Sequence, residues 1–74
     1  MSWYNPRVKL VKAQINGNER VVLKENATLD DLRLEAARLR TKFGYEVRPD
    51  GGVERYVATH RRFRGRYQLA LEPE

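Results

Sequence analysis

The most regular pattern in this chain lies in residues 27–44, ATLDDLRLEAARLRTKFG. Thr28 is followed three residues later by Asp31, a spacing that resembles a capping box, in which each side chain accepts a hydrogen bond from the other residue's backbone N–H. Gly44 is suited to the left-handed conformation in which many helices end. We therefore predict a helix from about Leu29 to Gly44. Its apolar residues recur every three or four positions and so form one stripe: Leu29, Leu32, Ala36, Leu39 and Phe43.

Two stretches of alternating, β-branched residues precede this helix and predict a hairpin. They are residues 7–15, RVKLVKAQI, and 19–24, ERVVLK, and residues 16–18, Asn-Gly-Asn, tolerate the positive φ of a tight turn. A two-residue loop would place Val21 opposite Lys12. We expect a three-residue loop, because a slip by one residue moves the core residues of a whole strand to the solvent side. The three-residue loop places these residues on one face: Val11, Ala13, Ile15, Val21 and Leu23.

Two to three further strands are expected after the helix. Residues 45–48 and 53–59 flank residues 49–52, Pro-Asp-Gly-Gly, which favour a turn. Residues 66–71, RYQLAL, alternate between apolar and less apolar side chains, as a half-buried strand does. One side of this last strand carries Tyr67, Leu69 and Leu71.

These elements predict a protein of the α+β class with the helix on one face of a sheet. A length of 74 residues is ordinary for one domain and too short for two, so residues 1–74 are expected to form a single domain. Within it, residues 1–6 are expected to be a flexible tail or one that folds back over the domain. Residues 72–74 are expected to be a C-terminal tail.

The order of hairpin, helix and further strands resembles the ubiquitin-like β-grasp fold, from about Arg7 to Leu71, most closely in the Ala-Thr-Leu run of residues 27–29. This resemblance implies a mixed sheet in which the last strand lies parallel to the first. It also implies a partner bound through an apolar patch on the open sheet face. Ubiquitin-like modifiers end in Gly-Gly, whereas residues 71–74 here are Leu-Glu-Pro-Glu and the Gly-Gly of residues 51–52 is internal. A conjugated modifier is therefore not expected.

The composition excludes several kinds of site. The chain has no Cys and a single His, His60, so we expect no disulfide and no metal site. The only serine is Ser2, and no nucleophile with a neighbouring base can be drawn, so we expect neither an enzyme nor a cofactor. No apolar run approaches the roughly 20 residues of a membrane span. The start, MSWYNPRVK, lacks the apolar stretch of a signal peptide, so a cytoplasmic protein without a membrane partner is expected.

The strongest local signal is a run of basic residues near the end of the chain. Residues 60–67, HRRFRGRY, hold four arginines and no acid, in a chain whose net charge is +5. In an extended segment, alternate arginines project to one side at roughly 6.6 Å intervals, and Phe63 and Tyr67 project to the other. Guanidinium groups bind phosphate through paired N–H donors, and aromatic rings stack on unpaired bases. The sequence therefore predicts that RNA or DNA is bound by Arg61, Arg62, Arg64, Arg66 and Tyr67, helped by Arg7, Lys9 and Lys12.

Two other interpretations of the basic run remain open. The arginines can be a solvated face, partly neutralised by Glu46, Glu54 or Glu72. They can also attract an acidic protein surface.

A second signal is apolar and favours a protein partner. On the hairpin face opposite the expected core lie Val8, Leu10 and Val22, with Trp3 and Tyr4 just upstream. One helix covers only one face of a sheet, so this set predicts an exposed patch for an adaptor or inhibitor, with a homodimer as a further alternative. Alternatively, the N-terminal tail covers these residues, or a strand bulge after Leu10 turns them inward.

Overall fold

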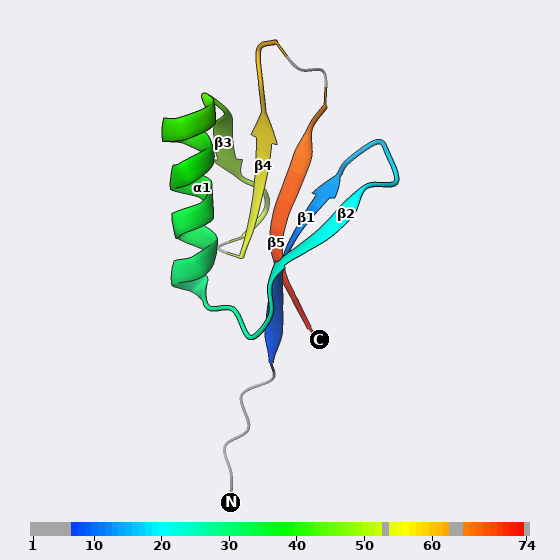
Figure 1. Ribbon diagram of the computed structural model, residues 1–74, viewed down its shortest axis with the longest axis vertical. Coiled ribbons are helices and arrows are strands. Elements are labelled where there is room, and N and C mark those ends of the chain that lie inside the picture. The colour runs from blue at the N-terminus through cyan, green and yellow to red at the C-terminus, as the bar shows by residue number, and fades with distance from the viewer. Residues whose placement is uncertain (1–6, 53, 63–64, 74) are drawn as a thin grey trace, which may run out of the picture.

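An antiparallel sheet with the strand order β2-β1-β5-β4-β3 and a single helix make up the fold (Figure 1). The computed structural model describes residues 7–52, 54–62 and 65–73. The predicted α+β class and the predicted order of elements are confirmed. The elements are β1 (Val8–Gln14), β2 (Arg20–Lys24), α1 (Leu29–Phe43), β3 (Glu46–Pro49), β4 (Arg55–Thr59) and β5 (Tyr67–Pro73).

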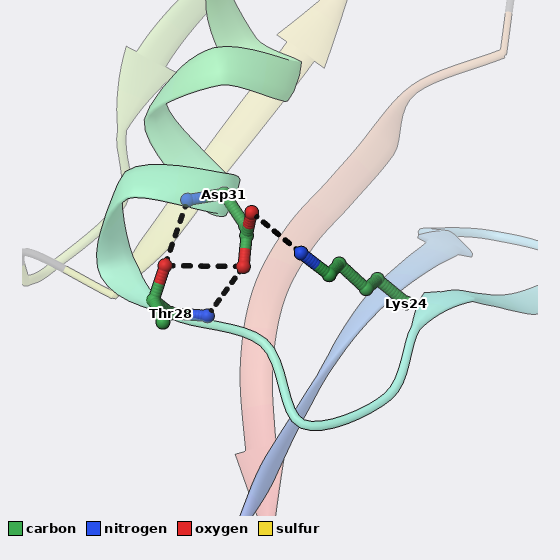
Figure 2. Close-up of polar contacts among 3 residues, drawn as sticks. All are labelled: Lys24, Thr28 and Asp31. Atoms are coloured by element: carbon green, nitrogen blue, oxygen red, sulfur yellow. Dashed lines mark hydrogen bonds and ion pairs between the residues drawn. The ribbon is translucent and has the colours of Figure 1, made fainter.

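Both ends of α1 have the geometry that the sequence predicts. The Thr28 hydroxyl oxygen accepts a hydrogen bond from the Asp31 backbone N–H at 3.2 Å, and the Asp31 carboxylate accepts one from the Thr28 backbone N–H at 2.8 Å (Figure 2). Gly44 has a φ of 72°, and its N–H donates to the Leu39 carbonyl. The Lys24 ammonium lies 3.0 Å from the other Asp31 carboxylate oxygen, which ties the end of β2 to the first turn of the helix.

The core lies between α1 and the sheet. The buried helix residues Leu32, Ala36 and Leu39 pack against residues from β1, β3, β4 and β5. Phe43 was expected to complete the buried stripe, but its side chain is 49 % exposed. It lies at the last turn of the helix, where its ring contacts the Arg38 guanidinium, and Tyr45 packs against the core at this end instead. The sheet residues of the core are Leu10, Val47, Ala58 and Leu69.

The register of the hairpin differs from the three-residue loop that we expected. Val11 pairs with Val22, and Val21 lies opposite Lys12, as the shorter-loop alternative requires. However, the next pair along β1 is Leu10 with Lys24. Two adjacent residues of β1 thus face residues two apart on β2, so the residue between them, Leu23, is the extra residue of a bulge.

Two consecutive β1 residues are buried on opposite faces of the sheet, because side chains alternate along a strand. Leu10 is 3 % exposed and belongs to the core beneath α1, whereas Val11 is 1 % exposed and faces the other way. Above Val11, an ion pair joins Arg20 of β2 to Glu72 of β5. Arg20 of β2 pairs with Ala13, two residues after Val11 along β1, and Glu72 of β5 pairs with Lys9, two residues before Val11. The ion pair between Arg20 and Glu72 therefore crosses over Val11.

The direction of β5 corrects the mixed sheet that the β-grasp resemblance implied. β5 runs antiparallel to β1 along its whole length, from Val8 opposite Pro73 to Gln14 opposite Tyr67. The strands β3, β4 and β5 form a meander, and each connection reverses the chain. Because α1 returns the chain to the end of the sheet where β2 begins, β3 runs in the same direction as β2, opposite to β1. Two further reversals then make β5 antiparallel to β1 as well. Pairing with β1 also makes residues 72 and 73 part of the strand rather than a tail.

In the described part of the chain, no helix is long and apolar enough to cross a membrane. The same residues contain no group of three or more side chains that would hold a metal ion.

Candidate nucleic-acid interface

The arginine segment follows β4 and lies at the end of the molecule where α1 stops (Figure 1). His60 connects the start of this segment to α1. Its Nε2 lies 3.0 Å from the carbonyl oxygen of Phe43, the last residue of α1, and its Nδ1 accepts a hydrogen bond from the Arg62 backbone N–H at 3.0 Å. Because Nδ1 accepts, the ring proton is on Nε2 and is donated to the Phe43 carbonyl. The imidazole therefore anchors the start of the segment to the C-terminus of the helix.

This anchoring changes the arrangement of the arginines. Residues 61–62 form a bend, and the Arg62 N–H turns back to its own segment instead of pairing in a ladder. The even spacing predicted for an extended segment is therefore not found at this end. Phe63 and Arg64, two further members of that prediction, lie outside the described residues.

Arg61 and Arg62 line an open hollow of about 550 Å³. Its floor and walls come from three places in the chain: the helix C-cap, the start of β3 and the end of β4. The remaining lining residues are Gly44, Tyr45, Glu46, Thr59 and His60. Arg66 lies apart from these two arginines, in a smaller hollow of about 240 Å³ with Gln14, Asn16 and Gly65. The structure thus brings Arg61 and Arg62 together and separates Arg66 from them.

The aromatic residue of the larger hollow is Tyr45, which the sequence analysis missed. Its ring meets the His60 ring edge to face, with centroids 5.0 Å apart, and the Tyr67 ring in the same manner at 6.4 Å. Tyr67, the predicted stacking residue, has the Lys12 ammonium over its ring at 4.5 Å and packs against the core. The sequence contained one indication of Tyr45, which directly follows the predicted helix cap Gly44 and so lies at the end of the helix.

The two predicted lysines occupy different ends of β1. Lys12 lies beside Tyr67 and so reaches the region of the basic segment. Lys9 pairs with Glu72, whereas the first residue of β5, Tyr67, pairs with Gln14. Lys9 and Gln14 are five residues apart on β1, a distance of about 17 Å along the strand. The structure does not bring Lys9 to the arginines, and Arg7 precedes it at that same far end.

The acids expected to neutralise the arginines form no ion pair with them among the described residues. Glu46 forms an ion pair with Arg48 at 2.8 Å, and Glu72 forms one with Arg20. Glu54 lies before β4, at the opposite end of that strand from the segment. In the described ranges, the exposed residues Arg61, Arg62 and Arg66 make no ion pair. Further positive charge at the same end comes from Arg40 and Lys42, in the last turn of α1.

The predicted apolar patch is not a continuous surface. Leu10 is buried beneath α1 and does not lie on the exposed face where it was predicted. A register shift between Leu10 and Val11 is found, as the bulge alternative proposed, but it does not turn Val22 inward. Val8 is half-buried, and its carbonyl accepts a hydrogen bond from Ala27. Val22 is 45 % exposed, but it faces away from Leu10 because it pairs with Val11. The two other predicted contact residues, Trp3 and Tyr4, lie outside the described residues.

Comparison with known proteins finds no family model, no curated protein and no solved structure that matches this chain.

Proposed function

We propose that this protein is a small, non-enzymatic binding module that holds the phosphates of a single-stranded nucleic acid at Arg61 and Arg62. The observation that carries the proposal is the hollow that Tyr45 lines together with these two exposed arginines, which have no acid partner among the described residues. A guanidinium group offers planar, paired donors to phosphate oxygens and keeps its charge at every physiological pH.

The other groups of the hollow favour a nucleotide over a bare anion. Its volume of about 550 Å³ falls within the roughly 300–1,000 Å³ of ordinary ligand sites. The half-buried Tyr45 ring offers the apolar surface that lines the hollow to a base, while the Thr59 hydroxyl is suited to the polar edge of that base. Unpaired bases can enter such a hollow, whereas paired bases are stacked inside the double helix. We therefore propose that single strands are bound.

The net charge of +5 supports the same function because it attracts polyanions over a distance. Arg66, Arg40 and Lys42 lie at the same end and extend the positive field around the hollow. A cytoplasmic location, expected from the sequence, forms part of this proposal.

Fluorescence anisotropy with labelled random-sequence oligonucleotides tests it, with single strands and duplexes of both RNA and DNA measured over a salt series. We expect binding to single strands that weakens steeply with salt. Arg61→Glu/Arg62→Glu should abolish binding at moderate salt, and at low salt it should reduce the slope of log affinity against log salt by about 1.4, or roughly 0.7 for each lost phosphate contact.

The matched control is Arg33→Glu/Arg55→Glu, which changes the net charge equally at two exposed arginines outside the hollow. It should retain most of the binding. An equal loss of affinity in both double variants would show that net charge alone, and not the hollow, drives binding. Absence of binding at low salt would overturn the proposal, and an acidic protein surface would then be the partner to seek.

A further inference from the structure

The helix covers only part of its side of the sheet. α1 packs on β3, β4 and β5, and the β1–β2 hairpin extends beyond it (Figure 1). Between α1 and the hairpin lies an open groove of about 480 Å³, and most of its lining surface is apolar. Leu34 of α1 and Leu23 of β2, two of its lining residues, are 68 % and 39 % exposed. This groove is distinct from the hollow that contains the arginines.

The helix side of the groove has a regular order of charges. Asp31, Glu35, Arg38 and Lys42 line it and recur at intervals of four, three and four residues, so they form one stripe along α1. Both acids lie in the first half of the helix and both bases in the second. Within one chain, Glu35 pairs with Arg38 at 3.0 Å and Asp31 with Lys24. Lys42 makes no ion pair in the described part of the chain.

The stripe is complementary to its own antiparallel copy. Reversing the helix about the midpoint between Ala36 and Ala37 brings position 31 opposite position 42 and position 35 opposite position 38, so each acid faces a base. The same rotation sets the two helix dipoles antiparallel, which is their favourable arrangement. Ala37, small and exposed near this midpoint, permits a close approach of the two helices.

We propose that a second copy of this chain occupies the groove, with the two α1 helices side by side and antiparallel around a two-fold axis near Ala36 and Ala37. The Leu34 side chain of each copy enters the groove of the other beside Leu23, which removes two exposed leucines per copy from water. Such an interface is isologous, since each copy supplies both the groove and the helix that fills it. This interface takes the place of the contact surface predicted around Leu10, a residue that is buried beneath α1.

The arrangement separates the two arginine hollows of the dimer. Each hollow lies at the C-terminus of its α1, and antiparallel helices place these termini at opposite ends. A helix of 15 residues is about 22 Å long, so the two hollows lie at least that far apart along the helix axis. The dimer does not rest on the proposed function, because no residue of the groove belongs to the arginine hollow.

Sedimentation equilibrium of the full chain at a series of concentrations and salt levels tests the dimer. We expect a monomer–dimer equilibrium whose dissociation constant rises with salt. Leu34→Asp should raise the dissociation constant at least tenfold, with an unchanged circular dichroism spectrum because Leu34 lies outside the core. A wild-type chain that is monomeric throughout, or a dimer that tolerates Leu34→Asp, would overturn the proposal.

Charge reversal tests the antiparallel arrangement independently of Leu34. Glu35→Arg and Arg38→Glu each place like charges opposite one another and should weaken the dimer severalfold, whereas Glu35→Arg/Arg38→Glu restores both pairs and should recover it. Arg33→Glu, on a side of α1 that does not line the groove, is the matched control and should leave the dissociation constant unchanged. A double variant as weak as the single variants would overturn the antiparallel pairing.

Discussion

Replacing Leu10 tests its burial in the core beneath α1. Leu10→Ala removes three carbon atoms from a side chain that is 3 % exposed and packed among the core residues beneath α1. At about 0.8 kcal/mol per buried carbon group the lost burial is roughly 2.4 kcal/mol, and the remaining cavity brings the expected loss of unfolding free energy to about 3 kcal/mol. The matched control, Val22→Ala, removes carbons that are already 45 % exposed and should cost less than about 1 kcal/mol.

Urea denaturation followed by circular dichroism measures both changes. A domain of 74 residues has an expected stability of roughly 4–11 kcal/mol, so the Leu10 variant loses a large fraction of it. Its melting temperature should fall by roughly 12–24 °C. If the variant does not fold, Leu10→Val is the milder substitution, with an expected cost of about 1 kcal/mol. Losses below about 1 kcal/mol at both residues would show that Leu10 is as exposed as Val22, and the burial of Leu10 beneath α1 would be refuted.

Three further predictions concern the helix ends and the arginine segment. The Thr28 backbone N–H, followed by the Lys24 ammonium, lowers the pKa of Asp31. The ionised carboxylate therefore stabilises the fold above its unfolded pKa of about 3.9, and this stability is lost as the pH falls through the lower folded value. Asp31→Asn should remove that part of the acid dependence in denaturation curves measured between pH 2 and 6. Gly44→Ala should lower the unfolding free energy by about 1 kcal/mol, because a φ of 72° is strained for alanine. His60→Ala should release Arg62 and weaken oligonucleotide binding severalfold in the anisotropy assay, with little change in melting temperature, and unchanged binding would contradict the anchoring role.

The candidate site was predictable in part. A run of arginines without an acid is visible in the sequence, and its position between the last two strands follows from the order of elements. The sequence did not predict that Tyr45 and Glu46 would line a hollow with Arg61, because they lie about fifteen positions away and meet it only through the pairing of β3 with β4. It also grouped Lys9 with the arginines, from which the length of β1 separates it.

Local sequence is sufficient to specify α1 and its ends, because the capping box and the Gly44 cap join residues within five positions of one another. It also determined which residues alternate in β5, since a strand exposes its two faces in turn whatever its neighbours are. Three features became clear only from the folded chain: the register of the hairpin, the antiparallel direction of β5 and the burial of Leu10. The direction of β5 and the burial of Leu10 depend on strands more than 50 positions apart in the chain and on the position of the helix. The register of the hairpin depends on which residues of β1 the helix and β5 cover. Free energies of packing between distant segments selected them, and no local pattern of residues encodes those energies.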